Sequence, residues 1–461
     1  MELSISNKDL ILKKLEKIVG KEFVSNKAED LFIYSQDSGA SVPRPVDFVV
    51  TPKTVEEVQK IIFFANEERI PLVPMGGGMT LSGLTIPIKG GIVIDMKRMD
   101  QILEINETSR YALIEAGVTT GRLQSYLERH HPDLQVSIPD APPSVTVMGN
   151  ALIHGSGFLS QKYGNHGDMI NGLEIVLPNG EICKVGSCAV SKYWFTRGPI
   201  PDFIGLFTSS FGTMGIATKL SIKLYPKPKM RDLVVGMLDD ITMIPDLVTK
   251  LTYSELVEDI LLAIQDKPNW MKGYIFILGF INANSEEELK SKTKSLQKIY
   301  HAVGGRQMKI PSEMKKFFLE KPIFYSTTSD FRKGGGFEYV GAMMPLEKIS
   351  EAIARGSSIS SKHGIIPTMG CRVIGKGHNI LFFISYAFNR ADPKDIQNAR
   401  SALKETNKAV LEVGGIPWKA ELHAQKLILE KMDPNFKKLY KNICNTLDPN
   451  GIMNPGNWDK I

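Results

Sequence analysis

The 461-residue sequence contains only four cysteines and no long apolar run. Cys183, Cys188, Cys371 and Cys444 form neither a CxxC pair nor an iron–sulfur spacing, which is typical of unpaired thiols in a reducing compartment. No segment approaches the run of about eighteen apolar residues that a membrane helix needs, and the N-terminal region lacks the apolar core of a signal peptide. We therefore expect a cytoplasmic protein without a membrane span.

The sequence also lacks strongly basic segments. Its formal net charge of +6 is spread along the chain, and no run of Lys and Arg with interleaved aromatic residues occurs. Nucleic acid is therefore not an expected partner, and the excess charge is better suited to a cleft for an anionic ligand. With 43% hydrophobic and 23% charged residues the chain is globular, and its length predicts at least two domains.

One segment is unusually rich in glycine. The stretch "PLVPMGGGMTLSG" (71–83) has three consecutive glycines and a fourth at its end. Glycine clusters are costly in chain entropy, so they indicate unusual backbone angles or a group lying close against the main chain. The N–H groups of such a loop form an anion site, and phosphate is the usual occupant.

The surroundings of this loop predict an α/β arrangement. "VDFVV" (46–50) predicts a strand, and Thr54 with Glu57 forms a capping box before an amphipathic helix. "PLVP" predicts a second strand, so the unit is strand–helix–strand, with a parallel pair and a right-handed crossover. The glycine loop would then begin at the carboxyl end of a strand, where α/β sheets bind ligands.

Two common phosphate loops do not fit this segment. A Walker A loop requires Lys followed by Ser or Thr after its last glycine, whereas Met79-Thr80 follows Gly78 and Leu84-Thr85 follows Gly83. A Rossmann fingerprint read from Gly76 has Leu81 in its last position and is not followed by a helix. A loop that wraps a dinucleotide pyrophosphate without a helix dipole remains.

The rest of the chain divides into two regions with different sequence patterns. A second glycine-rich stretch (139–181) ends in the hairpin pattern "LEIVLPNGEICKV", and a proline-lysine run at 226–228 suggests a boundary. Beyond it, strands alternate with capped amphipathic helices, for example at Ser285-Glu288 and at Asp392-Pro393. This pattern predicts an α+β domain whose antiparallel sheet is covered by helices on one face.

The ordered motifs resemble those of FAD-linked oxidases and dehydrogenases of the vanillyl-alcohol oxidase and p-cresol methylhydroxylase superfamily, which includes glycolate oxidase and D-lactate dehydrogenase flavin subunits. They include "IPLVPMGGGMTLSG", "YALIEAGVTTGRLQSYL", "VMGNALIHGSG", "YGNHGDMINGLEIVLPNGE" and "LDPNGIMNPG". The resemblance implies an α+β fold with an FAD-binding domain of p-cresol methylhydroxylase type over 1–228, in two subdomains of about 1–100 and 101–228. It further implies an α+β substrate or cap domain over 229–415 and a segment over 416–461 that returns to the FAD domain.

Carried over position by position, the resemblance also implies which residues contact FAD. These are Pro74, Gly76, Gly77, Gly78, Thr80, Ser82, Pro139, Asp140, Ser144, Gly149, Asn150, His154, Gly157, Gly215, Ile216 and Asn454. Members of the family often link FAD to a histidine in the first glycine loop. Met79 lies near that position here, so we expect noncovalent FAD.

The 2-hydroxy-acid branch of the family holds a divalent metal with a cap Gly-His motif, a second His seven residues later and a Glu-His-Gly segment. Gly377 and His378 match the first element, but Ser385 occupies the second His position, and Glu421 and His423 stand in the last segment. Both segments approach the flavin in family members, so these three side chains are expected to converge. The incomplete set does not favour a metal.

Four residues are therefore the catalytic candidates for oxidation of a 2-hydroxy acid of D-lactate or glycolate type by hydride transfer to the flavin. His378 or His423 would accept the hydroxyl proton, because imidazole titrates near pH 6.5. Arg372 would hold the substrate carboxylate. Glu421 is expected to lie beside the two histidines at the flavin.

Other functions remain open at this stage. A phenolic-alcohol oxidase or dehydrogenase of vanillyl-alcohol oxidase type would use Asp140, but Leu81 and Phe158 replace its tyrosines, and Trp418-Lys419 its Tyr-Arg pair. A transferase like alkylglycerone-phosphate synthase and the flavin subunit of an electron-transfer complex are further alternatives. The electron acceptor, an electron-transfer protein or iron–sulfur subunit among the options, is undefined, and a homo-oligomer is left open.

Overall fold

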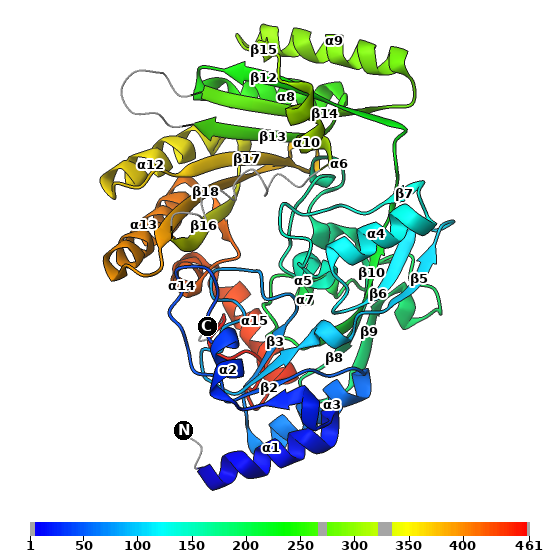
Figure 1. Cartoon of the computed structure of the whole chain (residues 1–461), viewed down its shortest axis with the longest axis vertical. Coiled ribbons are helices and arrows are strands. Elements are labelled where there is room, and N and C mark those ends of the chain that lie inside the picture. Colours follow the sequence, from blue (N-terminus) through cyan, green and yellow to red (C-terminus); the bar gives the residue numbers. More distant parts are fainter. Residues whose placement is uncertain (1–4, 266–273, 321–333, 459–461) are drawn as a thin grey trace.

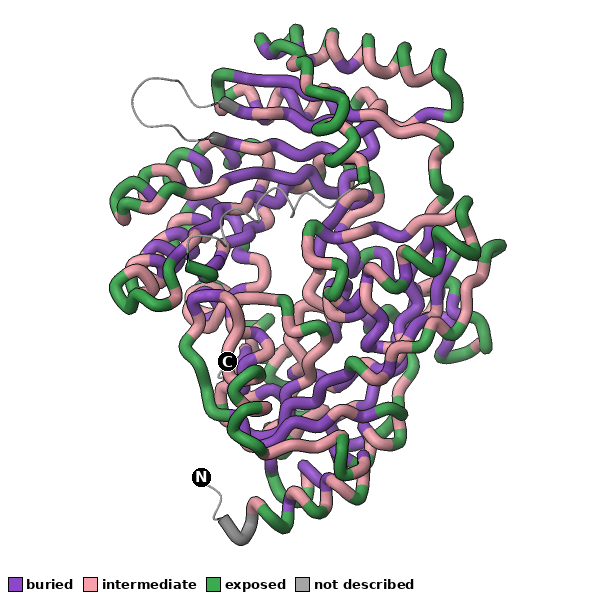
Figure 2. The backbone as a smooth tube through the Cα atoms, in the orientation of Figure 1, coloured by how far each residue is buried: buried purple, intermediate pink, exposed green. Residues whose placement is uncertain are grey.

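A computed structural model of the chain describes residues 5–265, 274–320 and 334–458. An eight-stranded sheet with its helices occupies the upper half of Figure 1, and a four-stranded sheet, a five-stranded sheet and a two-stranded pair lie below it. The central strands of the three larger sheets are mostly buried, whereas their edge strands are more exposed (Figure 2). None of the helices in the described ranges is long and apolar enough to cross a membrane.

The first sheet has the strand order β1-β2-β4-β3. Its strands are β1 (Val24–Ser25), β2 (Phe48–Val50), β3 (Leu72–Met75) and β4 (Ile92–Asp95). The predicted strand, helix and second strand are all present, and α3 (Val55–Glu68) is capped by Thr54, whose side chain accepts from the Glu57 amide. The two predicted strands are not direct neighbours, because the wholly buried β4 lies between them and pairs in parallel with both.

The second sheet has the order β5-β6-β10-β8-β9, and all its pairs are antiparallel. Its strands are β5 (Ile102–Asn106), β6 (Tyr111–Glu115), β8 (Ile170–Val176), β9 (Ile182–Gly186) and β10 (Ile216–Lys223). The predicted hairpin is confirmed: Val176 pairs with Ile182, and Gly180 in the turn has φ +84°. The helices around the first two sheets, besides α3, are α1 (Ile5–Val19), α2 (Ala28–Tyr34), α4 (Thr120–His130), α5 (Val147–Leu152), α6 (Ser160–Tyr163) and α7 (Ile204–Phe207). A separate pair of short strands consists of β7 (Leu134–Gln135) and β11 (Tyr225–Pro226).

The third sheet has the order β15-β12-β14-β13-β17-β18-β16-β19, and every pair is antiparallel, as predicted. Its strands are β12 (Met230–Leu238), β13 (Val257–Gln265), β14 (Tyr274–Ala283), β15 (Arg306–Met308), β16 (Gly335–Met344), β17 (Thr368–Ile374), β18 (Asn379–Asn389) and β19 (Ile416–Trp418). One face packs in a single core with α8 (Ile244–Ser254), α9 (Glu286–Ala302), α12 (Ile349–Lys362) and α13 (Pro393–Val413).

The other face of this sheet carries a smaller apolar cluster. Leu233, Leu278 and Phe280 belong to it, together with side chains of α10 (Ser312–Glu320). Phe158, from the segment between α5 and α6, packs edge-on against Phe280 with a centroid distance of 5.2 Å. The face of the large sheet opposite α8, α9, α12 and α13 is therefore the face that meets the glycine-rich part of the chain.

The C-terminal segment crosses from the third sheet back to the first. After β19 the chain forms α14 (Leu422–Lys431) and α15 (Pro434–Leu447), drawn in orange and red in Figure 1. The Leu72 amide then donates to the Ile452 carbonyl at 2.7 Å, and the Asn454 amide donates to the Leu72 carbonyl at 2.7 Å. The end of the chain thus extends the edge of the first sheet beside β3.

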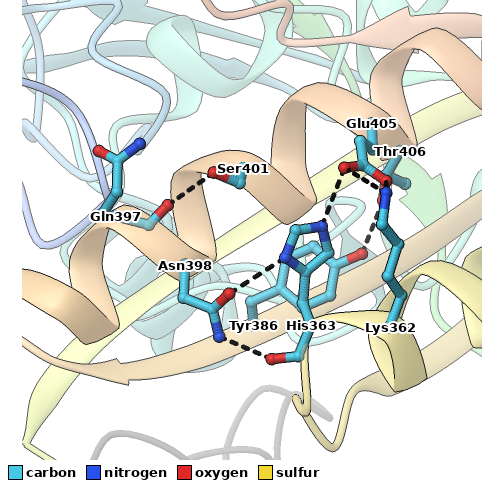
Figure 3. A network of polar contacts seen from close by, with 8 residues as sticks. All are labelled: Lys362, His363, Tyr386, Gln397, Asn398, Ser401, Glu405 and Thr406. Carbon is cyan, nitrogen blue, oxygen red and sulfur yellow. Dashed lines mark hydrogen bonds and ion pairs between the residues drawn. The ribbon is translucent and has the colours of Figure 1, made fainter.

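A polar network joins α12 to α13 on the helical side of the large sheet (Figure 3). His363, which ends α12, has its two ring nitrogens 3.0 Å from Asn398 Oδ1 and 3.1 Å from Glu405 Oε1. Lys362 Nζ donates to both Glu405 oxygens at 2.9 Å. The hydrogen bond from Lys362 is the largest cause that lowers the pKa of the Glu405 carboxyl, and His363 adds to it.

We expect Glu405→Gln to lower Tm by about 2–3 °C at pH 7, because exposed ion pairs contribute roughly 0.5–1 kcal/mol. A carboxyl whose pKa is lowered on folding stabilises the folded state at a pH above its ordinary pKa of about 4.3. This stabilisation is lost as the pH falls through the lower pKa of the folded state. The Tm difference measured by thermal unfolding should therefore shrink as the pH is lowered below the ordinary carboxyl value. Glu286→Gln, in a largely exposed pair with Lys290, is the control; an equal shift in both variants would contradict the assignment.

Candidate functional site

A pocket with about 1150 Å³ of empty space lies where the glycine-rich segments of the first two sheets meet the third sheet. Its walls come from the first glycine loop, from the segment around α5, from the start of β10 and from the residue after β19. Nine of the sequence-predicted cofactor residues line it: Pro74, Gly76, Gly77, Gly78, Thr80, Gly149, Asn150, Gly215 and Ile216.

The glycine loop packs directly on the backbone before α5. A Cβ atom on Gly76 would lie 2.4 Å from Thr146 Oγ1, and one on Gly77 would lie 2.7 Å from the Ser144 carbonyl oxygen. Thr146 in turn caps α5 by accepting from the Gly149 amide at 3.2 Å. Glycine is therefore required here by close approach, so that two main-chain segments form one wall.

The loop continues through three left-handed residues that other parts of the chain hold in place. Leu81 and Ser82 have φ of 59° and 57°, which is uncommon for residues with side chains. The Ser82 amide donates to Glu338 Oε2 at 3.1 Å, and the Gly83 amide donates to Asp37 Oδ2 at 2.9 Å. Burial, reinforced by Asp37, raises the pKa of the Glu338 carboxyl to about 7, against the hydrogen bonds it accepts. Ser82 thus anchors the loop to β16 and does not line the pocket.

A half-buried lysine completes the pocket wall. Lys419 Nζ donates to the Thr80 carbonyl at 3.1 Å and lies 4.6 Å and 4.7 Å from the ring centroids of Tyr339 and Trp418. Desolvation lowers the pKa of Lys419 to about 8, opposed by the charges of Glu338 and Asp37. Within the described ranges no carboxylate forms an ion pair with Lys419, so this cation faces the pocket without a direct counter-ion.

A second charged cluster links the large sheet to the segment before α5. Arg372 on β17 is buried, with Nη1 2.5 Å from Asp140 Oδ2 and Nη2 2.9 Å from Asp259 Oδ2. Burial raises the pKa of the Asp259 carboxyl to about 8, against the opposing charge of Arg372. Two carboxylates of the chain already pair with this guanidinium, so the binding of a substrate carboxylate by Arg372 stays a prediction from the sequence and is not used below.

The expected convergence of His378, Glu421 and His423 does not occur. His378 is exposed in the turn before β18, beside the Lys376–Glu255 ion pair of 2.7 Å. Glu421 is the N-cap of α14 and accepts from the His423 amide at 2.7 Å. In the described ranges no group of three His, Cys, Asp or Glu side chains is arranged to hold a metal.

The strand register explains this separation. Trp418 lies opposite Gly341, which lies opposite Phe383, five residues along the strand from His378. The chain beyond Trp418 runs antiparallel to β16, and thus away from the end of the sheet that carries the turn. The motif around His378 and the motif around Glu421 each match the family locally. The distance between the two motifs depends on the strand register, which no local motif specifies.

The remaining predicted residues lie next to the pocket wall and outside its lining. Pro139 forms a backbone bridge with Gly157, where a Cβ atom would lie 2.0 Å from the Ile138 carbonyl oxygen. Ser144 is exposed, and its carbonyl meets Gly77. His154 has φ 56°, and burial lowers its pKa. Asn454 is buried and donates through Nδ2 to the Phe211 carbonyl at 2.6 Å.

The pocket has the properties that a phosphate-containing dinucleotide requires. Three consecutive glycines expose backbone N–H groups, and Thr80 Oγ1 is buried at the same wall without a hydrogen-bond partner in the described ranges. An unpaired buried hydroxyl is costly unless a ligand satisfies it. The Lys419 cation and the mixed apolar walls, which include Val145, Ile153 and Ile216, suit an anionic group and a planar ring system.

Two family models match the sequence. One is described as an FAD binding domain and covers residues 46–186, and the other is described as the C-terminal domain of FAD linked oxidases and covers residues 246–458. Together they cover about three quarters of the chain. The glycine loop, the segment around α5 and Lys419 all lie inside these matches.

Relatives and solved structures agree with the family models. The chain is 26% identical to the glycolate oxidase subunit GlcD of Bacillus subtilis over 97% of this chain and 96% of that protein. It is 26% identical to the mitochondrial D-lactate dehydrogenase (cytochrome) of Arabidopsis thaliana over 89% of this chain and 73% of that protein. A crystal structure of p-cresol methylhydroxylase with substrate bound superposes with a TM-score of 0.85 at 20% identity, covering 99% of this chain and 97% of that one.

The superposition confirms the predicted fold class, including the antiparallel sheet of the cap. The family models confirm FAD as the cofactor, and the glycine loop and the unpaired Thr80 hydroxyl fit that cofactor. The chain belongs to the FAD-linked oxidases and is an FAD-dependent oxidoreductase with the fold of p-cresol methylhydroxylase.

Proposed function

We propose that this protein oxidises a small 2-hydroxy acid and that Lys419 binds the substrate's carboxylate. The single observation that carries this proposal is the half-buried Lys419 ammonium at the pocket wall, which has no directly paired carboxylate in the described part of the chain. A charge that is partly removed from water is stabilised when an opposite charge reaches it, so this position favours an anionic substrate. The similarity to a glycolate oxidase subunit and a D-lactate dehydrogenase supports the same substrate class.

In this proposal the glycine loop and Thr80 hold the pyrophosphate of FAD through backbone N–H groups and the free hydroxyl. Asn150, Gly215 and Ile216, which line the same pocket, would contact the rest of the cofactor. When bound there, FAD would supply the hydride acceptor for oxidation of the carbon that carries the substrate hydroxyl.

Asp140 is the proposed acceptor of the hydroxyl proton. Its carboxylate is one-third exposed, follows Pro139 and precedes Ala141, a residue of the pocket lining. Arg372 fixes one oxygen of Asp140 and is itself held by Asp259, so the carboxylate has a defined orientation. His423 stays a predicted alternative from the sequence, and exposed His378 has no part in the proposal.

A phenolic alcohol is the second candidate substrate. The Lys419 ammonium lies over the rings of Tyr339 and Trp418, and this aromatic surrounding favours a planar phenolate as the anion. The likeness in fold to p-cresol methylhydroxylase is compatible with this reading, although at 20% identity it concerns the fold alone. No contact in the described ranges specifically favours the transferase or the isolated electron-transfer subunit.

Lys419→Met should lower kcat/KM for 2-hydroxy acids by about 100-fold, because truncating one member of a buried charged contact costs 2–5 kcal/mol or more. The ammonium form binds the anion, so wild-type kcat/KM should fall as pH rises through about 8, the pKa of Lys419. Lys419→Arg should move that fall to higher pH. Steady-state pH profiles with FAD-loaded protein measure both effects.

Lys376→Met is the matched control, because Lys376 is exposed and pairs with Glu255 away from the pocket. Its kcat/KM and pH profile should equal those of the wild type. If Lys419→Met kept the wild-type profile, Lys419 would not be the anion-binding residue.

Asp140→Asn should lower kcat by about 10²–10⁴-fold, which is the usual contribution of a positioned general base. The amide preserves the shape of the carboxylate but removes a charge that faces the buried Arg372, so FAD content and Tm are measured beside the rate. Rapid-reaction measurement of flavin reduction isolates the step that is affected. Asp239→Asn, an exposed residue paired with Arg306, is the control. A reduction rate within threefold of the wild type in Asp140→Asn would exclude this role.

A further inference from the structure

A buried histidine lies behind the pocket wall and outside its lining. His166 begins a short helical turn (His166–Met169) and is 4% exposed. Its Nδ1 contacts Asn150 Oδ1, and its Nε2 lies 2.7 Å from Ser137 Oγ. The Leu159 amide donates to the same Ser137 oxygen at 3.3 Å.

The contact with the Asn150 amide oxygen defines where the imidazole proton lies. An amide oxygen only accepts, so the proton of the neutral ring is on Nδ1, which donates to Asn150 Oδ1. Nε2 is then an acceptor, and the Ser137 hydroxyl donates to it. Burial, followed by the charge of Arg372, lowers the pKa of His166 to about 3, so the ring stays neutral at physiological pH.

This hydrogen bond determines the orientation of the Asn150 amide. Because Oδ1 accepts from His166, the NH₂ group lies on the other side of the amide, and it has no hydrogen-bond partner in the described ranges. Asn150 lines the cofactor pocket. A Cβ atom on Gly155 would lie 2.5 Å from Asn150 Nδ2 and 2.6 Å from Oδ1, so glycine is needed there for the amide to occupy this position.

We propose that His166 is a positioning residue that orients Asn150 so that its NH₂ group donates a hydrogen bond to an acceptor atom of FAD. Hydrogen bonds then connect the Leu159 amide, Ser137, His166 and Asn150 in sequence. Together they fix which side of the Asn150 amide faces the pocket. The proposal rests on the proposed contact of Asn150 with the cofactor. It is independent of the substrate class, and its test needs no substrate.

Two substitutions of His166 separate orientation from packing. Asn carries its amide NH₂ close to the position of imidazole Nδ1, whereas Gln carries it close to the position of Nε2. We therefore expect His166→Asn to keep the donor to Asn150 and to bind FAD within about threefold of the wild type. His166→Gln should bind FAD about tenfold more weakly, as the loss of one positioned hydrogen bond allows, and should shift the visible absorption of the bound flavin.

The measurements are fluorescence titration of the FAD-free protein with FAD, and the absorption spectrum of the loaded protein. Equal FAD affinity and equal spectra in His166→Asn and His166→Gln would overturn the proposal. Thermal unfolding of both FAD-free variants identifies a general loss of folding, in which case the next substitution provides the test.

Asn150→Asp leaves an oxygen for the His166 N–H and removes the NH₂ donor. We expect about tenfold weaker FAD binding with an altered flavin spectrum, while the Tm of the FAD-free protein stays within about 2 °C of the wild type. Wild-type affinity and spectrum in this variant would overturn the proposal. An incorrect substrate class would instead leave these FAD measurements unchanged and would appear only in turnover.

Discussion

A positive charge that lies beside the cofactor pocket without a directly paired carboxylate in the described residues is the interaction on which the site depends. Lys419 is half-buried, with one backbone carbonyl and two aromatic rings as direct neighbours. Burial favours its neutral form, whereas the more distant carboxylates of Glu338 and Asp37 favour the charged form, and the pKa near 8 reflects that balance. An anionic substrate that entered the pocket would add the direct counter-charge and keep the ammonium charged.

The same residues connect the large sheet to the glycine-rich segments. Trp418 donates to the Ile153 carbonyl at 2.7 Å, and Lys419, the next residue, donates to the Thr80 carbonyl at 3.1 Å. Glu338 holds the Ser82 amide, and Arg372 holds Asp140. Each contact joins a residue of the cap sheet to a segment that lines or supports the pocket. A displacement of the sheet would therefore alter the cofactor loop and the proposed proton acceptor together.

Much of the fold was predictable because its signals are local. Capping boxes, strand alternation and the Asn-Gly turn depend on residues within a few positions of one another, and the corresponding elements all formed. The insertion of β4 between β2 and β3 was not predicted, because strand order depends on contacts between distant segments. The glycine loop was recognisable for a similar reason: the absence of side chains at Gly76 and Gly77 is itself a sequence signal.

The catalytic candidates were less predictable. The motif around Gly377 placed His378 near the flavin, but the register of the large sheet puts this histidine at an exposed turn. Glu338 and Asp259 gave no sequence signal, since a carboxylate on an apolar strand becomes notable only when its buried neighbours are known. In the sequence, Lys419 was recognisable only as a replacement for an arginine. That no carboxylate of the described residues pairs directly with it became evident from the three-dimensional packing.

The most direct test of the account is anaerobic titration of the FAD-loaded protein with D-lactate, glycolate and 4-hydroxybenzyl alcohol, followed by absorbance of the flavin. The account predicts stoichiometric bleaching by a 2-hydroxy acid at neutral pH, with weaker reduction as the pH rises above about 8, where Lys419 loses its charge. Bleaching by the phenolic alcohol alone would identify the second candidate. An oxidised spectrum with every 2-hydroxy acid tested would contradict the central claim.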